Sequence, residues 1–548
     1  MNALILLLLS ISLFVLGYLW YSRLISRWLG VDRKRPTPAH TKNDGIDYVP
    51  APKPVLLGHH FASIAGAAPI IGPITASAFG WLPVYIWIIL GGIFIGAVHD
   101  FTSIFVSIRH EGRSIGEIIE KVMGLTGKKL FLIFSWSTLT LVVAVFTIVV
   151  AKTFAAVPQA ATSSMLFIFI SVGFGLGIRK GFFNIAGGSL IGIIALIGCL
   201  AAGIYMPLQL GMKSWVYILI GYVFIASVAP VWMLLQPRDY LNSFLLYAML
   251  GFAVLGIVLF NPPLRLSPIS SFYVPQLGYL FPILFVTVAC GAISGFHSLV
   301  SSGTTAKQLN CESDARTIGY GGMLIESCLA VIALITAVYL TQKQYFDFMG
   351  VGKSGPIALF SNGIGEFLSH LGIPIKTGTS FTALAVSAFA MTSLDTAARL
   401  GRFAFQEFFE NGVIASESVK KVLCNRYFAT FITTIGGGLL AFSGQWKSIW
   451  PIFGTANQLL AAIALLTVTV YLIKEKRNYL FTGIPALIMM IITLSSLASL
   501  IYKNTIMSPD PGQAAISIFL FGIAVFLLYV SFKTLNDGKK VLNATASP

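Results

Sequence analysis

Stretches of about 20 consecutive apolar residues recur along the whole chain, and they constrain the fold more than any other feature. A helix of that length crosses the hydrocarbon core of a bilayer. Of the 548 residues 56% are hydrophobic and only 10% are charged, whereas soluble domains carry about 25% charged residues. A soluble core cannot bury so much apolar surface. The sequence therefore predicts an all-α polytopic membrane protein.

The apolar segments predict about 15 transmembrane helices. A leader helix covers 2–29, a first group of five spans covers 57–205, a second group of five covers 215–398, and four further spans cover 425–533. The spans after the leader are expected at 57–78, 82–108, 128–152, 163–178, 185–205, 215–236, 241–260, 279–303, 318–341, 377–398, 425–443, 449–473, 479–502 and 513–533.

The distribution of Lys and Arg supports this count and sets its orientation. With the N-terminus outside and the C-terminus in the cytoplasm, 28 of the 36 basic residues fall on cytoplasmic segments. Such an excess marks the cytoplasmic side of membrane proteins. The net charge of +16 is explained in this way and does not indicate a nucleic-acid partner. The five cysteines show no paired spacing, so no disulfide framework is expected.

Helix breakers interrupt the first span after the leader. The stretch GHHFASIAGAAPIIGP, residues 58–73, contains three glycines, two prolines and two adjacent histidines. A broken helix frees backbone groups, which hydrocarbon does not tolerate, so the break must line a cavity or be buried in protein. Half-helix ends then present partial charges to a ligand. The predicted substrate-binding residues here are Ser63, Ala65, Gly66, Ala67 and Pro69.

A similar run, IASVAPVWMLLQPRDY at 225–240, lies five spans later. An odd separation inverts the second half in the membrane, which predicts a leucine-transporter-like inverted repeat of five plus five helices with broken helices 1 and 6. Ser227, Ala229 and Pro230 are the predicted substrate-binding residues of this second break. Gly and Pro also serve ordinary helix packing, which is the alternative for either run alone.

Ionisable residues inside spans indicate function by default. The predicted proton-coupling set lies on the cytoplasmic half and comprises His59, His60, His99, Asp100, His297 and Asp395. Alternatives are that Asp100 and Asp395 pair with Arg109 and Arg399, and that the adjacent histidines are interfacial anchors. Successive helical residues diverge by 100°, so only one of the two histidines is expected to face the cavity. Glu326 lies two turns into its span and can simply bond a neighbouring helix.

The span at 279–303 is rich in small hydroxyl residues. Ser294 is assigned to the predicted substrate site. Close helix packing explains such residues equally well. A sodium site is the other reading, and its predicted residues are Ala62, Ala65, Ser298, Ser301 and Ser302.

Five of these stretches together resemble the carbon starvation A family. They are DYVPAPKPVLLGHHFASIAGAAPIIGP (47–73), AVHDF (97–101), VWMLLQPRDYLNSF (231–244), ACGAISGFHSLVSSGTT (289–305) and TSLDTAARLGR (392–402). The resemblance covers most of the chain, and Ser63, Ala68 and His99 depart from the common family pattern. It implies a secondary transporter of the bacterial inner membrane that imports peptides or pyruvate under nutrient limitation, with proton coupling.

A carboxylate substrate needs positive potential, and half-helix N-termini supply it without a buried base. No Lys or Arg falls in the middle of a predicted span. A peptide also needs an acceptor for its amino group, for which Asp100 is the candidate, and this favours a small monocarboxylate such as pyruvate. The expected partners are that solute, a coupling proton or sodium ion, and membrane lipid, and the oligomeric state stays open.

Two other function classes compete with a transporter. An intramembrane metalloenzyme built on the histidines would need spaced clusters such as HxxxH, which do not occur. A channel or sensor does not explain paired helix breaks. We therefore expect no enzymatic activity, catalytic residue, metal site or cofactor. Residues 342–376 are expected to form a short helix over the outer mouth or an ordinary packed loop.

Overall fold

The computed structural model describes residues 2–45, 48–230, 233–350, 353–410, 417–442 and 446–545. Within them, eleven helices are long and apolar enough to cross a membrane, and one bent helix pair makes a twelfth crossing. Backbone groups in hydrocarbon must bond within their own segment, which is why the apolar runs fold as helices. The polytopic all-α class is thereby confirmed.

The first half of the chain runs from the leader to the helix that ends at Phe260. Its elements are α1 (Ala3–Leu16), η1 (Gly17–Tyr21), α2 (Ser22–Leu29), α3 (Pro38–Thr41), α4 (Lys53–Ile64), α5 (Ala68–Ala76), η2 (Ser77–Phe79), α6 (Trp81–Gly91), η3 (Gly92–Gly96), α7 (Ala97–Arg109), α8 (Ile115–Ala156), α9 (Pro158–Arg179), α10 (Ile185–Tyr205), α11 (Met212–Val228) and α12 (Leu235–Phe260).

The second half begins with a two-stranded antiparallel hairpin, β1 (Tyr273–Val274) and β2 (Gly278–Tyr279). Its helices are α13 (Leu280–Thr287), α14 (Ala289–Ala292), α15 (Phe296–Val300), η4 (Ser301–Thr305), α16 (Ala306–Gln308), η5 (Arg316–Gly321), α17 (Gly322–Val338), α18 (Gln342–Met349), α19 (Pro356–Ser369), α20 (Ile375–Glu410), α21 (Glu417–Leu423), α22 (Arg426–Phe442), α23 (Trp446–Lys474), α24 (Leu480–Tyr502), η6 (Lys503–Met507) and α25 (Pro511–Thr545).

Three predicted spans are not long single helices, which explains the difference between twelve crossings and fifteen. The span expected at 215–236 is the 17-residue α11, and the span expected at 425–443 is the 17-residue α22. The span expected at 279–303 is a series of short helices from α13 to α16. The number fifteen stays a prediction.

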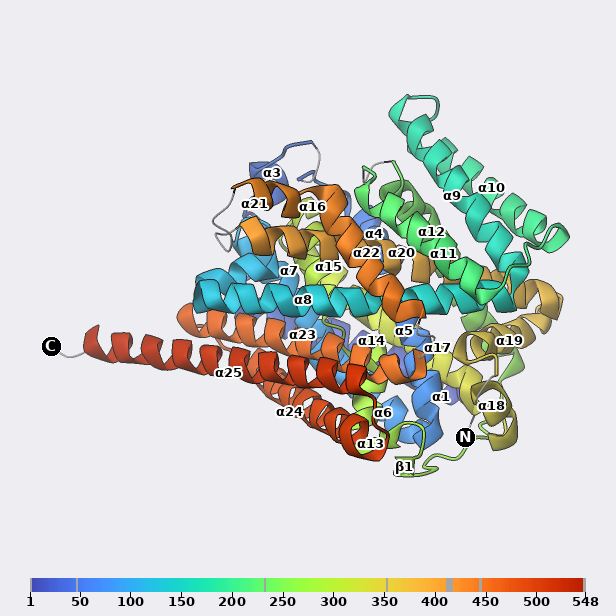
Figure 1. Cartoon of the computed structure of the whole chain (residues 1–548). Helices are drawn as coiled ribbons and strands as arrows, with labels where there is room; N and C mark the ends of the chain where they lie inside the picture. The colour runs from blue at the N-terminus through green and yellow to red at the C-terminus, as the bar shows by residue number, and fades with distance from the viewer. Residues whose placement is uncertain are drawn as a thin grey trace.

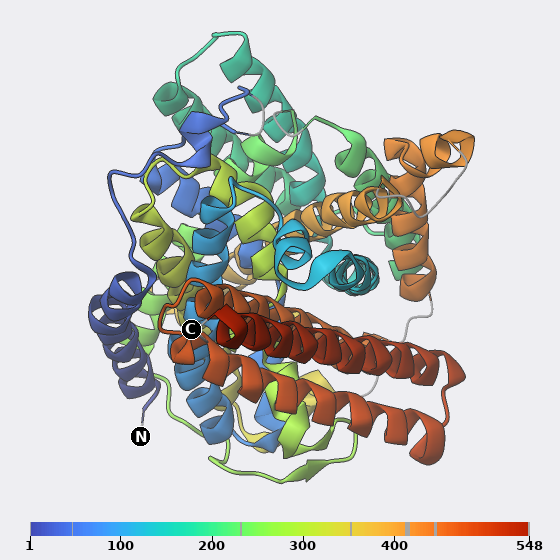
Figure 2. The same cartoon turned by 90° about the vertical axis from the view of Figure 1, so that its left-hand side faces the viewer.

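Helices α8 and α20 pack along each other through the middle of the molecule, and α11, α22 and α23 also contact α8 (Figure 1). Helix α8 contains a kink at Gly124, whose φ of +82° is a left-handed conformation that glycine adopts readily. The leader packs on α17 and α6 at one edge (Figure 2). Helices α9 and α10 pair with each other and project from the body (Figure 1).

The loop expected over the outer mouth contains two helices, α18 and α19. The hydroxyl of Tyr345 in α18 donates to the backbone oxygens of Ile74 and Thr75, at 2.8 and 3.2 Å. These oxygens lie near the end of α5, so α18 is fastened to the second half of the first broken span.

Candidate functional site

The first broken span is interrupted where the sequence predicts it. Helix α4 ends at Ile64, α5 begins at Ala68, and the two parts meet at an angle of 49°. Ala65 has the non-helical dihedrals φ −76° and ψ 77°. Pro69 sits in the first turn of α5, where its missing N–H costs nothing. No side chain caps the N-terminus of α5.

Ser63 and Ala67 flank this linker. The Ser63 hydroxyl donates to the backbone oxygen of His59 at 2.9 Å, so it is engaged within its own helix. Ala67 accepts the first backbone hydrogen bonds of α5, from Ile70 and Ile71. Both residues are buried, as are the other linker residues.

A second interruption lies between α14 and α15, in the span that starts at Leu280. Ile293 is extended there, with φ −162° and ψ 134°. Asn457 of α23 supports the break: its side-chain oxygen accepts from the Phe296 N–H at 2.9 Å, and its amide donates to the Ser294 hydroxyl at 3.0 Å. A side chain at Gly295 would lie 2.2 Å from the backbone oxygen of Asn457, so only glycine permits this approach.

The predicted second break is not in the middle of a span, and this corrects the expectation for Ser227, Ala229 and Pro230. Helix α11 ends at Val228 and α12 begins at Leu235, so the small residues mark a helix end between two spans. The Arg399 guanidinium caps that end by donating to the backbone oxygens of Ala226 and Ala229 at 2.8 Å. Small residues followed by proline terminate helices as readily as they interrupt them.

The two interruptions meet at a small cavity between α8, α20 and α23. Its lining residues are Ile64, Gly66, Ala68, Val142, Phe146, Cys290, Phe296, Ser393, Phe453 and Asn457. The space open to the centre of a water molecule is about 10 Å³, which is roughly what one water needs. A side chain at Gly66 would lie 2.5 Å from the Ser393 hydroxyl oxygen and 3.2 Å from the Phe146 ring. Because Gly66 has no side chain, Ser393 and Phe146 can lie this close to the linker.

Four ionisable side chains from three helices form a second feature, which we call the histidine–carboxylate cluster: His99, Asp100, His297 and Glu326. Nδ1 of His297 lies 2.8 Å from one oxygen of Asp100, and its Nε2 lies 3.3 Å from Glu326. Nδ1 of His99 lies 2.7 Å from the other oxygen of Asp100. All four side chains are fully buried.

The histidine–carboxylate cluster contains no Lys or Arg, so protons alone can balance its two carboxylates. Buried charge is costly unless it is paired, and histidine changes charge near neutral pH. The arrangement can therefore hold a proton or release it. Among the described residues no group of three or more His, Cys, Asp or Glu side chains is arranged to hold a metal ion. The sequence predicts that His99, Asp100 and His297 lie in the cytoplasmic half of the membrane, but it does not show that Glu326 contacts them.

His60 lies beside the cluster, fully buried, with Nδ1 at 2.8 Å from the Thr305 hydroxyl. Its ring also lies against Gly322, one turn before Glu326 on α17: a Cβ added at that glycine would be 3.3 Å away. The alternative reading, in which Asp100 pairs with Arg109, does not hold: Arg109 instead bonds Glu312 at 2.6 Å.

Asp395 belongs to a different group, which we call the arginine–carboxylate network: Tyr222, Arg238, Asp239 and Asp395. The Arg238 guanidinium donates to Asp395 and to the Tyr222 hydroxyl, and Tyr222 donates to Asp395 at 2.7 Å. The other amino group of Arg238 lies 3.5 Å from Asp239. His59 approaches from α4, 3.9 Å from Asp239.

Arg238 lies in the first turn of α12, at the end of a span, so it does not contradict the expectation that no base falls in the middle of a span. Its Pro237 neighbour suggests a loop, but proline is tolerated in the first turn of a helix, and α12 begins at Leu235. Arg238 is 1% exposed, and its carboxylate partners are equally buried. The predicted proton-coupling residues therefore divide between two separate groups.

The predicted sodium residues are all buried in α4, its linker, α15 and η4. The hydroxyl of Ser298 donates to the Gly295 backbone, and that of Ser302 donates to the Ser298 backbone, both at 2.7 Å. Ser301 makes no side-chain hydrogen bond within the described residues. The predicted sodium site, which also includes Ala62 and Ala65, stays a prediction.

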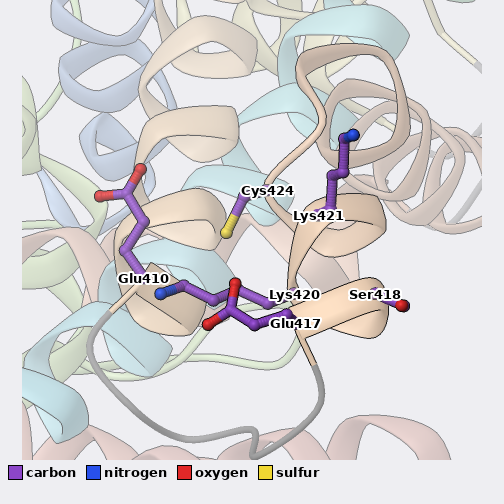
Figure 3. A pocket seen from close by; sticks show the side chains of 6 residues that line it. All are labelled: Glu410, Glu417, Ser418, Lys420, Lys421 and Cys424. Atoms are coloured by element: carbon purple, nitrogen blue, oxygen red, sulfur yellow. The ribbon is translucent and has the colours of Figure 1, made fainter.

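A separate hollow lies on the surface at the ends of α20 and α21 (Figure 3). It is lined by Glu410, Glu417, Ser418, Lys420, Lys421 and Cys424. Glu410 follows Ser393 by 17 residues on α20, which is roughly 25 Å along a helix. The hollow is therefore far from the interrupted spans.

Comparison with known proteins gives a consistent result. The sequence matches the family described as "Carbon starvation protein CstA" over residues 2–353 and 348–496. It is 36% identical to the "Peptide transporter CstA" of Helicobacter pylori strain J99, covering 90% of this chain and 81% of that protein. It is 33% identical to the "Pyruvate/proton symporter BtsT" of Escherichia coli, over 90% of this chain and 81% of that one.

A crystal structure of the Eremococcus coleocola manganese transporter matches the fold with a TM-score of 0.53 at 12% identity, over 91% of this chain and 99% of that one. At that identity the likeness concerns the fold alone. The relatives are transporters rather than enzymes, which confirms the expectation that this chain is not an enzyme.

Proposed function

Because the chain belongs to the carbon starvation CstA family, we propose that it imports a small carboxylate nutrient by alternating access, together with protons. One observation carries the proposal: two interrupted spans meet at a closed central cavity beside a buried cluster of histidines and carboxylates. The interruptions offer backbone groups to a solute, and the cluster offers a place for a proton.

The span from α4 to η2 and the span from α13 to α16 are the proposed pair of broken helices. The second is the seventh span after the first, and because seven is odd they cross the membrane in opposite directions, as an inverted repeat requires. We start the second repeat near Leu280 instead of residue 215, and we regard α9 and α10 as an insertion in the first. The shared cavity and the projecting position of α9 and α10 support this assignment.

A small monocarboxylate such as pyruvate is the favoured substrate, ahead of a short peptide. The uncapped N-terminus of α5 begins at the cavity and provides positive partial charge for a carboxylate. A peptide also needs an acceptor for its α-amino group, and both oxygens of Asp100 are engaged by His99 and His297. The cavity must widen for any solute, because it now has room for about one water.

The coupling proton binds the histidine–carboxylate cluster in this proposal. His297 bridges Asp100 and Glu326, so a proton gained or lost there changes the charge that joins α7, α15 and α17. Helix α15 follows directly from the second interruption, and this links the proton to the solute site. Sodium is the alternative ion, but the Ser302 hydroxyl oxygen already accepts from the Ile115 N–H at 3.1 Å, which competes with a cation for that oxygen.

The orientation follows from the excess of basic residues on one side. We assign the N-terminus to the outside of a bacterial inner membrane and the C-terminus to the cytoplasm. The start of α4, both ionisable groups and the end of α20 then lie in the cytoplasmic half.

Proteoliposomes test the function directly. Uptake of pyruvate and of a dipeptide is measured with an imposed pH gradient, with and without sodium. We expect pyruvate to accumulate under inward proton flow and independently of sodium. Failure to accumulate either solute in response to a gradient would refute the proposal, and dependence on a sodium gradient would replace the coupling ion.

A further inference from the structure

The two adjacent histidines of α4 serve different groups on different faces of the helix. His60 is bonded to Thr305 at 2.8 Å on the side of the histidine–carboxylate cluster. His59 is directed to the other side, where its Nδ1 lies 3.9 Å from Asp239 of α12. Consecutive helical positions are separated by 100°, so both contacts form at once.

The arginine–carboxylate network carries more acid than base. Asp239 and Asp395 supply two carboxylates, and Arg238 supplies one guanidinium. One amino group of that guanidinium bonds Asp395. The other lies 3.5 Å from Asp239, which is a long and weak contact. The uncompensated negative charge is therefore concentrated on Asp239.

The oxygen of Asp239 that faces His59 accepts no hydrogen bond from the described residues. The Asp239 side chain is 1% exposed, so water does not compensate it, while the His59 side chain is 18% exposed. A buried carboxylate requires a cationic partner. A proton on His59 supplies one.

Three other ionisable groups, on α20, α4 and α11, already have partners. Arg399 of α20 is bonded to the backbone at the end of α11. Lys53, at the start of α4, pairs with Asp314 at 2.7 Å. Tyr222 of α11 is neutral and bonds Asp395. His59 is therefore the group best placed to balance Asp239.

We propose that His59 and Asp239 form a second proton-binding site, a latch that fastens α4 to α12 when His59 is protonated. The proposal rests on the transport function above, because α4 must leave α12 for a solute to exit past it. Deprotonation removes the pair and frees the half-helix. A low pH on the cytoplasmic side then keeps α4 against α12 and the exit path of the solute closed. Proton binding at the histidine–carboxylate cluster, in contrast, accompanies the solute.

Hydrogen–deuterium exchange of the full chain in nanodiscs tests the latch without any solute. Exchange of the peptide covering α4 is compared at about pH 6 and about pH 8, where histidine changes charge, after correction for the chemical effect of pH. We expect exchange at the lower pH to be slower by about threefold or more, as for a local opening that has become rarer.

Matched variants assign the effect to residues. His59→Gln and Asp239→Asn should each remove the difference between the two pH values. Asp100→Asn, in the other group, and His370→Gln, an exposed histidine that directly follows α19, should keep it. If Asp239→Asn does not fold, His59→Gln decides the question alone.

Three results would overturn the latch: no pH difference in the wild-type protein, a difference that survives His59→Gln, or one that disappears in Asp100→Asn. The proposed function fails separately. A protein that keeps the α4 response but never accumulates pyruvate or dipeptide retains the latch and loses the transport assignment.

Discussion

The two buried ionic groups on either side of α4 differ in one property, the presence of a permanent cation. The arginine–carboxylate network contains Arg238, which stays charged at every physiological pH. The histidine–carboxylate cluster contains only groups that gain or lose protons. The charged side chains are buried in both. A permanent cation therefore fixes part of the charge in the arginine–carboxylate network, whereas protons alone set the charge of the histidine–carboxylate cluster.

Arg238→Met should produce the largest effect, because it leaves Asp395 and Asp239 without their shared cation. Removing one partner of a buried ion pair typically costs about 3–5 kcal/mol. We expect a large fall in the unfolding midpoint in detergent. The double variant Arg238→Met with Asp395→Asn should recover most of the loss. Equal instability of the single and double variants would show that Arg238 acts through something other than these charges.

Asp100→Asn should spare the fold and abolish the response to the gradient. The amide keeps the size of Asp100 but cannot balance His297. Gradient-driven uptake should fall by about 10²-fold, the effect expected when a positioned proton-transfer group is lost. Solute exchange at equal pH on both sides is the control and should persist. Uptake that still follows the gradient would move the coupling site away from the cluster.

Gly66→Ala tests the central cavity without changing any charge. The new methyl would meet the Ser393 hydroxyl oxygen at 2.5 Å, and overpacking of this kind costs about 1–3 kcal/mol. Uptake should fall at every pH with an unchanged pH profile, and Ser393→Gly should restore part of it. A shifted pH profile would mean that the cavity and an ionic group are not independent.

Lys42→Gln should have the smallest effect on stability and uptake, and it serves as the control for the other variants. Lys42 pairs with Glu111 at 2.7 Å, but both side chains are largely exposed. Exposed pairs contribute little because water screens them. No measurable change in unfolding midpoint or uptake is expected. A clear effect would mean that exposure does not separate this pair from the buried groups.

The sequence predicts the features that depend on local composition. Apolar length reveals most of the spans, and the density of glycine and proline around Gly66 reveals the first interruption. The second interruption at Ile293 has no proline nearby and depends on Asn457, which is remote in sequence. The sequence of the segment itself does not indicate this contact with Asn457.

The partners of the ionisable residues likewise depend on tertiary packing. Depth in the membrane places Asp395 and His297 in the same half, and sequence reasoning groups them together. Only the packing of α12 against α20 shows that Asp395 is paired with Arg238. Pro237 hides that arginine, because the sequence around it is typical of a loop.

The near-absence of space at the centre has a consequence for energy conservation. A continuous file of water molecules carries protons rapidly, and a gap with room for about one water cannot contain such a file. Protons therefore cannot cross this cavity along a file of water, because side chains fill the space that such a file would need.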